Sequence, residues 1–284
     1  MVFMKMKMKF NFITVLLFSL IFSVPMLHAQ APNPGIQDNS FLIEEAYNQE
    51  FGVVQHISTF TYFPESDDWA YSFTQEWPVP GIRHQLSYTL NTVRPGVSAD
   101  QGAGFGDVVL NYRYQLVGNG EARIAVAPRF SLILPTGDST LARGAGATGY
   151  QTNLPMSVVL NRRFVTHWNA GSTFIPHARN IEGQRASIVS YNFGQSVIWQ
   201  TTSRFNVMFE TYYVRGQGIA APGKTEWNST LFLNPGVRWA YNFKSGLQIV
   251  PGIAMPIGVG PSEGLKGVFL YLSFEHPFRK LPAM

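Results

Sequence analysis

The chain has 284 residues and a formal net charge of +4; 45% of the residues are hydrophobic, 14% aromatic and only 13% charged. Charged residues make up about a quarter of an average soluble domain, so this composition argues against a soluble globular protein, and no apolar run beyond residue 30 reaches the roughly 18 residues of a membrane-spanning helix. The lack of cysteine excludes disulfides and thiolate chemistry. Because only helices and closed barrels satisfy the backbone hydrogen bonds in lipid, and a spanning helix is excluded, the composition indicates a membrane β-barrel.

The first 29 residues are predicted to be a secretory signal peptide. Lys5, Lys7 and Lys9 form its positive start, and residues 12–26 form an apolar stretch that is too short for a membrane anchor. Cleavage is expected after Ala29. Loss of the three lysines leaves 18 basic and 17 acidic residues, a net charge of +1. No basic run follows, so nothing in the sequence indicates a nucleic-acid partner.

Residues 30–52 are expected to be a periplasmic segment that precedes the barrel. Residues 40–50 within it could form a short helix. The first hypothesis is a solvated tail, because runs of like charge are usually solvated. The alternative is a plug, in which Glu44, Glu45 and Glu50 enter a lumen that presents arginines.

From residue 53 to residue 278, hydrophobic and polar side chains alternate as they do in strands with two different faces. The clearest case is the stretch 104–134, where two alternating runs flank Gly118-Asn119-Gly120, a turn sequence in which positive φ costs little. Each run carries an arginine at mid-length on its polar face, as expected of a strand that crosses a bilayer at a tilt. About twelve strands are predicted, at 53–63, 68–77, 83–93, 105–116, 122–134, 150–160, 165–175, 188–199, 204–215, 228–241, 246–257 and 266–275.

The connections between these strands alternate in length. Those after even-numbered strands are short, such as 161–163 and 242–245, whereas most of those after odd-numbered strands are long, such as 94–104 and 135–149. Outer-membrane barrels have short periplasmic turns and longer extracellular loops. The predicted fold is therefore all-β: an antiparallel transmembrane β-barrel of about twelve strands over residues 53–278, in the bacterial outer membrane. The even strand count places both termini in the periplasm, and residues 279–284 form a C-terminal tail.

Four prolines, at positions 155, 235, 251 and 256, lie inside predicted strands. Each proline removes a donor from the hydrogen-bond ladder. Either the strands bulge at these positions or the predicted boundaries are displaced. A lateral opening in the barrel wall is the functional alternative.

Continuation of the alternation predicts which charged side chains line the lumen. Acidic and basic residues are mixed among them, so they could form ion pairs that fill a narrow interior. They could equally line a pore that selects polar solutes. Twelve strands lie between the filled eight-stranded barrels and the open channels of 16 to 18 strands, so a narrow or plugged pathway is expected. The predicted lumen residues are Glu76, Arg83, Arg113, Arg129, Glu210, Arg238 and Glu275.

Catalytic and metal sites find little support. His56 and Ser58 share one face of the first predicted strand, which resembles the His-x-Ser of outer-membrane phospholipase A. Thr59 and Phe60 follow here instead of the Asn-Gly of that family, and the orienting asparagine is missing from the next strand. The other histidines lack ligand spacing. No catalytic residue, metal or cofactor is therefore predicted.

Three short motifs resemble a known family. They are Gly-Phe-Gly-Asp at 104–107, Asn-Tyr-Arg-Tyr-Gln-Leu at 111–116 and Leu-Pro-Thr-Gly-Asp at 134–138. The pattern is similar to that of the outer-membrane barrels named for the MetA pathway of phenol degradation. The resemblance covers residues 53–278 and implies an outer-membrane transporter associated with the catabolism of aromatic compounds. One departure is that residues 279–284 follow Phe278, whereas such barrels usually end on an aromatic residue.

The expected function is the passive passage of small molecules, hydrophobic or aromatic ones included, across the outer membrane. The alternatives are a structural or adhesive barrel with a closed lumen and, third, a lipid hydrolase. The expected partners are outer-membrane lipid, a small-molecule solute and, during biogenesis, the barrel-assembly machinery.

Overall fold

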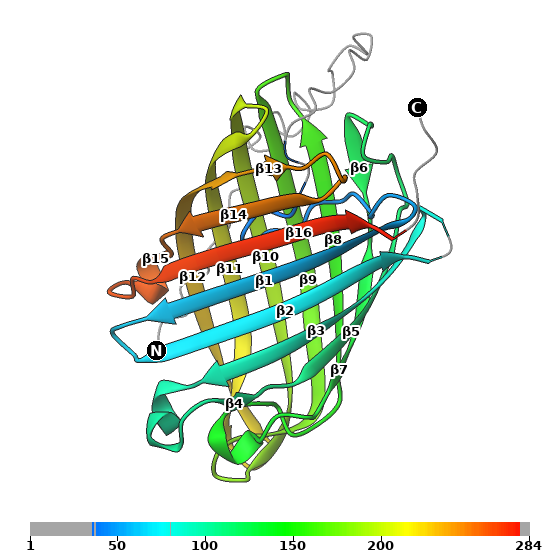
Figure 1. The fold of residues 1–284 in the computed structure, drawn as a ribbon. Coiled ribbons are helices and arrows are strands. Elements are labelled where there is room, and N and C mark those ends of the chain that lie inside the picture. The colour runs from blue at the N-terminus through cyan, green and yellow to red at the C-terminus, as the bar shows by residue number, and fades with distance from the viewer. Residues whose placement is uncertain (1–35, 37, 80, 279–284) are drawn as a thin grey trace, which may run out of the picture. The chain divides into compact units, whose positions relative to one another are not determined.

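The structure is a computed structural model that describes residues 36, 38–79 and 81–278. The predicted signal peptide and the C-terminal tail lie outside these residues. Within them the chain forms a single antiparallel sheet that closes on itself, because β1 pairs with both β2 and β16 and β14 joins β16 to β12. Figure 1 shows the strands side by side and tilted around the barrel.

Twelve strands form the wall, which confirms the predicted fold. They are β1 (Val53–Phe63), β2 (Asp68–Pro78), β3 (His84–Arg94), β5 (Val108–Tyr114), β7 (Arg129–Leu134), β8 (Gly149–Val159), β9 (Phe164–Arg179), β10 (Arg185–Thr202), β11 (Phe205–Ala221), β12 (Lys224–Trp239), β14 (Gln248–Ala254) and β16 (Val268–Pro277). Four short strands extend or flank them: β4 (Gly104–Phe105), β6 (Ile124–Val126), β13 (Tyr241–Asn242) and β15 (Ile257–Gly258).

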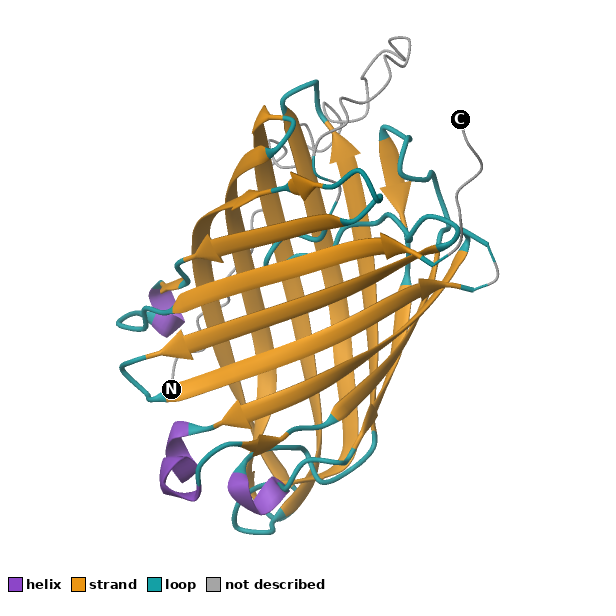
Figure 2. Cartoon of the chain, in the orientation of Figure 1, coloured by secondary structure: helices purple, strands orange, loops and turns teal. Residues whose placement is uncertain are grey.

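Helix is almost absent from the described part of the chain. Three short 3₁₀ turns occur there: η1 (Gly96–Gln101), η2 (Ser139–Leu141) and η3 (Gly260–Ser262), drawn in purple in Figure 2. In these residues no helix has both the length and the apolar character needed to span a membrane.

The two faces of the wall have opposite character, as the alternation predicts. Leu90, Leu110 and Leu154 point outward and remain 39%, 44% and 48% exposed. Ser131 and Glu210 point inward and are fully buried. Apolar residues outside and polar residues inside are the reverse of a soluble protein and typical of a barrel surrounded by lipid.

The strands β9 to β12 are longer than predicted. β11 and β12 remain paired as far as Ala221 and Lys224 and are joined at Gly223, whose φ of +70° closes the turn. Residues 216–227, predicted as a loop, are therefore mostly strand. The sequence pattern did not predict these longer strands, because the glycine- and alanine-rich stretch 216–223 shows no alternation of polar and apolar residues. Long connections remain at 95–107 and 135–148, and we call the end that carries them the loop rim and the opposite end the turn rim.

The prolines mark breaks in the hydrogen-bond ladder. Pro155 lies in β8 opposite Ala127, the neighbour of Pro128, where pairing with β7 ends at Asn153 and pairing with β6 begins at Met156. Pro235 of β12 similarly lies where pairing passes from β14 to β15, across the break at residues 255 and 256. β6 with β7, and β14 with β15, are thus each one wall strand interrupted at a proline, so some of the predicted continuous strands are split.

Candidate functional site

The N-terminal segment lies inside the lumen. Ile36 and residues 38–50, which we call the lumen segment, contact inward-facing side chains around the wall, and Ser40, Ile43 and Ala46 are each at most 1% exposed. The structure contains no helix at residues 40–50, so that prediction is wrong. Instead of extending into solvent as a tail, the segment is enclosed by the barrel.

The wall supplies the hydrogen bonds that a helix would have supplied. Successive backbone N–H groups of the lumen segment donate to side chains of the wall at 2.7 to 3.3 Å, so they do not need carbonyl partners four residues earlier. The acceptors are Glu210 for residues 42 and 43, Asn169 for residue 44, Ser157 for residue 46, Gln115 for residue 48 and Gln85 for residue 49.

Two buried arginines hold the carbonyl groups of the lumen segment. Arg113 donates to the carbonyl oxygens of Tyr47 at 2.6 Å and of Glu45 at 3.2 Å. Arg238, which is fully buried, donates to the carbonyl oxygens of residues 38 and 39 at 3.0 and 2.5 Å. Charged donors make stronger hydrogen bonds than neutral ones. The wall therefore recognises the backbone of the segment as much as its side chains.

Side-chain contacts add specificity at a few positions. The carboxylate of Asp38 accepts hydrogen bonds from Gln55 at 2.8 Å, from Tyr271 at 2.5 Å and from Ser273. Glu44 forms an ion pair with Arg129 at 2.6 Å. These contacts place one acidic side chain of the segment near the turn rim and another at mid-barrel.

Glycines in the wall make room for two of the large apolar side chains of the lumen segment, Phe41 and Ile43. A Cβ on Gly194 would lie 2.2 Å from Cδ1 of Ile43, and a Cβ on Gly252 would lie 2.5 Å from Cε1 of Phe41. The Phe41 ring also packs against Tyr271, with ring centroids 5.6 Å apart. Wall and segment are therefore matched in shape as well as in hydrogen bonding.

Burial shifts the protonation of the acidic groups in the lumen segment. The pKa of Glu45 is raised to about 8, mainly by burial and also by the nearby Asp38, against the lowering effects of Arg113 and Arg238. Burial also raises the pKa of Asp38, although Arg238 and its hydrogen-bond donors oppose the shift. The segment thus carries less negative charge than its sequence suggests.

The predicted lumen residues are mostly brought together by the structure. Five of them face the lumen on wall strands: Glu76, Arg113, Glu210 and Arg238 are buried, and Arg129 is half-buried. Glu275 also lies on the inward face of β16, opposite Gln55, near the turn rim. Arg83 is a correction, since β3 begins only at His84 and leaves Arg83 exposed in the turn before it. Of the three glutamates of the plug hypothesis, Glu44 and Glu45 lie in the lumen and Glu50 is exposed.

Several contact residues escaped the sequence analysis. Asp38, Asn169 and Ser157 contribute as much to the site as the charged residues that were predicted. The available signal was the run of Ser, Asn and Gln at alternate positions of otherwise apolar strands. Such residues are expected to face inward, because a lipid-facing amide would be left without a partner.

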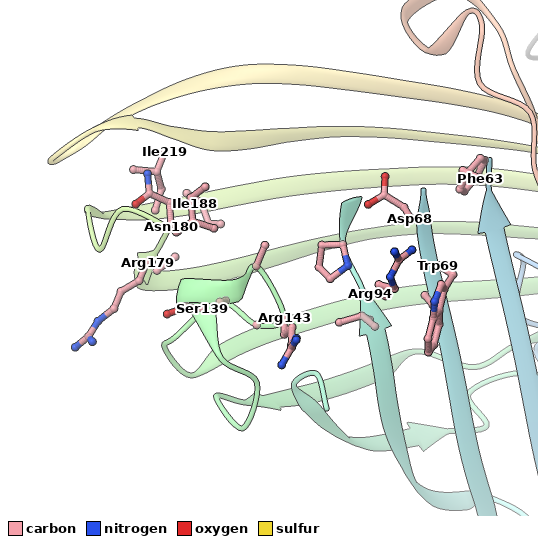
Figure 3. Close-up of a pocket in the computed structure, with 18 of the residues that line it drawn as sticks. Phe63, Asp68, Trp69, Arg94, Ser139, Arg143, Arg179, Asn180, Ile188 and Ile219 are labelled. Atoms are coloured by element: carbon pink, nitrogen blue, oxygen red, sulfur yellow. The ribbon is translucent and has the colours of Figure 1, made fainter. Parts of the chain in front are cut away.

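A first cavity, which we call the vestibule, opens at the loop rim. It has a volume of about 680 Å³. Figure 3 shows its aromatic, aliphatic and arginine side chains. Its lining includes Phe63, Trp69, Val93, Pro95, Ile181, Ile188 and Ile219, together with Asp68, Arg94, Arg143 and Arg179. Arg94 is paired with Asp67 at 2.7 Å, and this contact lowers the pKa of the Asp67 carboxyl.

A second cavity, which we call the inner cavity, follows along the same strands. Thr61 of β1 and Ala70 of β2 line the vestibule, and the next inward positions, Thr59 and Ser72, line the inner cavity. The inner cavity has a volume of about 310 Å³ and is lined mainly by hydroxyl and amide side chains. Residues 39–44 of the lumen segment form its floor. The two cavities and the segment therefore lie in series.

The first and third sequence motifs meet at the loop rim. The carboxylate of Asp107 accepts hydrogen bonds from the backbone N–H groups of Gly137 at 2.9 Å and Ala145 at 2.8 Å. A Cβ on Gly144 would lie 2.3 Å from an oxygen of Asp107, so the close approach needs glycine there. The motifs thus have a structural role: they fix the 135–148 loop beside the vestibule.

The His-x-Ser pair does not assemble as a catalytic site. His56 and Ser58 point outward from β1, with Nε2 of His56 lying 3.2 Å from Nε2 of His276. The hydroxyl of Ser58 lies 3.2 Å from that of Tyr71. Each side chain is therefore engaged with another partner. Across residues 36, 38–79 and 81–278, no group of three or more His, Cys, Asp or Glu residues could hold a metal ion.

No protein-family model matches the chain, and no curated protein matches it in sequence. Solved structures resemble it. An outer membrane channel from Pseudomonas putida F1 has a TM-score of 0.57 at 14% identity, over 85% of this chain and 99% of that chain. The beta domain of the Bordetella autotransporter Brka has a TM-score of 0.41 at 11% identity, over 80% and 98% of the two chains. The first likeness shows that the chain has the fold of an outer-membrane β-barrel.

Proposed function

We propose that the protein is an outer-membrane channel for the passive passage of small molecules, closed in its resting state by the lumen segment. The observation that carries this proposal is the serial arrangement of the vestibule, the inner cavity and the segment within one barrel. A barrel with a purely structural role has no need of two cavities in line. The segment is held mainly by hydrogen bonds to the wall, which water can replace when the segment leaves.

The short connections favour a periplasmic turn rim, because outer-membrane barrels carry their longer loops outside the cell. In this orientation the vestibule faces the exterior and the lumen segment faces the periplasm. Val53 at the start of β1 and Pro277 at the end of β16 pair with each other at the turn rim, so both termini are proposed to be periplasmic. Outer-membrane lipid surrounds the apolar outer face, and the barrel-assembly machinery inserts it.

The lining of the vestibule favours solutes with an apolar body. Aromatic and aliphatic side chains predominate, as in most small-molecule sites, and a few polar groups fix orientation. The motif resemblance to barrels named for the MetA pathway of phenol degradation points to the same class, small hydrophobic or aromatic molecules. The solved structure from Pseudomonas putida F1 is described as a channel, which agrees with this proposal.

Liposome swelling tests passage directly. Proteoliposomes that carry a variant without residues 36–50, in which the lumen segment no longer closes the pathway, are expected to swell in glycine, arabinose and sucrose at rates that fall with solute size. Protein-free liposomes are the control. Swelling no faster than in the control, for every solute, would favour the alternative of a structural or adhesive barrel.

A further inference from the structure

The ion pair between Glu44 and Arg129 differs from every other contact of the lumen segment. Arg129 donates from Nε to one carboxylate oxygen of Glu44 at 3.0 Å, and its Nη2 lies 2.6 Å from the other oxygen. This two-point geometry is the one by which arginine binds any carboxylate. Arg113 and Arg238, in contrast, hold backbone carbonyl groups of the segment.

The remaining partners of Arg129 are neutral groups of the wall. Its Nη1 donates to Asn111 at 2.7 Å and to Ser131, and its Nη2 donates to Gln151 at 2.9 Å. These bonds fix the guanidinium on the wall whether or not the segment is present. Among the described residues, Glu44 is the one acidic side chain that forms an ion pair with Arg129. The wall thus offers a preformed site for one carboxylate.

This site is accessible from the inner cavity. Both Glu44 and Arg129 line that cavity, and their side chains are 28% and 15% exposed. The cavity volume of about 310 Å³ lies at the small end of the range for ligand sites, so the fitting ligands are small. Tyr271, Ile57 and Val109 also line the cavity and offer apolar surface to the body of such a ligand.

We propose that Arg129 binds the carboxylate of a small organic acid that enters through the vestibule, and that this carboxylate takes the place of Glu44. The inference rests on the proposed channel function and names a solute class for it: small molecules with an apolar body and one carboxylate. Loss of the Glu44 contact weakens the attachment of the lumen segment. Arrival of the solute therefore favours opening of the pathway.

The competition has a thermodynamic consequence that can be measured. If the solute and Glu44 share one site, the solute binds more tightly when Glu44 cannot compete, and the segment is released more easily when the solute is bound. A neutral molecule of the same shape lacks the charge-assisted bonds and gains nothing from the loss of Glu44.

The binding test uses the full mature chain in detergent, with benzoate as the probe and isothermal titration calorimetry as the readout. Glu44→Gln is expected to bind benzoate about tenfold more tightly than the unmodified chain, and Arg129→Gln is expected to lose binding. Glu50→Gln is the matched control, because Glu50 is an exposed glutamate of the same segment; its affinity should equal that of the unmodified chain. Benzyl alcohol, the neutral analogue, should bind equally to Glu44→Gln and to the unmodified chain.

The release test uses maleimide labelling. The chain contains no cysteine, so Ser40→Cys introduces a single thiol at a buried position of the lumen segment. Benzoate is expected to accelerate labelling several-fold, and Glu44→Gln to be labelled fast without benzoate and no faster with it. Equal benzoate affinity in Glu44→Gln and in the unmodified chain would overturn the inference, even if liposomes swell and the channel itself is real. Benzoate binding as expected without any liposome swelling would instead overturn the channel and keep the carboxylate site.

Discussion

Gly252 offers a way to displace the lumen segment without removing any of its polar groups. In a Gly252→Ala variant the new methyl group would lie 2.5 Å from Cε1 and 2.9 Å from Cζ of Phe41. Carbon atoms prefer separations of about 3.5 to 4.0 Å, so the ring must move by about 1 Å. The ring is 7% exposed and packed against Phe269 and Tyr271, which leaves it little free space.

Overpacking of this kind costs about 1 to 3 kcal/mol. We call the lumen segment seated when it lies in the lumen as in the structure, and released when it has left. A cost of that size, which applies to the seated state alone, shifts the equilibrium between the seated and the released segment toward release by roughly 5- to 150-fold. The assay is maleimide labelling of the Ser40→Cys thiol, which reports release of the segment. The labelling rate of the double variant Gly252→Ala, Ser40→Cys is expected to exceed that of Ser40→Cys by this factor.

Two further variants separate displacement of the segment from damage to the wall. Gly218→Ala is the control, because a Cβ at Gly218 would meet its nearest neighbour, the side-chain nitrogen of Asn228, at 3.4 Å. It should leave the labelling rate unchanged. Phe41→Leu removes the ring atoms that Gly252→Ala would contact, so adding Gly252→Ala to a Phe41→Leu background should change the rate little. Labelling of Gly252→Ala at the rate of Gly218→Ala would refute the reasoning.

Three other predictions concern the charge of the lumen segment, the loop rim and the outer face. Burial raises the pKa of Glu45 from 4.5 to about 8, so this side chain is neutral in the seated segment below about pH 8. Seating is therefore strongest at low pH and weakens as pH rises from about 4.5 to 8, which raises the labelling rate of the Ser40→Cys thiol. Glu45→Gln should flatten this rise in labelling rate. Asp107→Ala removes two hydrogen bonds from the 135–148 loop, at a cost of about 1 to 3 kcal/mol, and should speed tryptic cleavage after Arg143, whereas unchanged cleavage would contradict the role assigned to Asp107. His56→Ala and Ser58→Ala should leave phospholipid turnover at the background level of the unmodified protein, and a loss of turnover in either variant would revive the hydrolase hypothesis.

The wall of the barrel was predictable because its physical cause is local. Lipid on one side and a polar lumen on the other impose a period of two on every strand, so the placement of Arg113 inside and Leu110 outside follows from neighbouring residues alone. Arg83 shows the limit of this reasoning. The period says which face a residue of a strand takes, but it does not say where the strand begins.

The conformation of the lumen segment was not predictable in the same way. The partners of its backbone, such as Asn169 and Glu210, lie 125 to 168 residues away in the chain. Residues 40–50 therefore look like a weak helix when only local propensity is considered, and the wall overrides that propensity by accepting hydrogen bonds from most of the backbone N–H groups between residues 42 and 49. The mixed charges of the lumen did suggest the plug, but the choice between tail and plug required the three-dimensional wall.

Single-channel conductance in planar bilayers tests the central claim most directly, by comparing the mature chain with a variant that lacks residues 36–50. The lumen segment fills the barrel below the inner cavity, so its removal is expected to turn small or rare conductance steps into larger and sustained ones. The same conductance for both proteins, or a silent barrel after the deletion, would contradict the claim that this segment closes a pathway through the lumen.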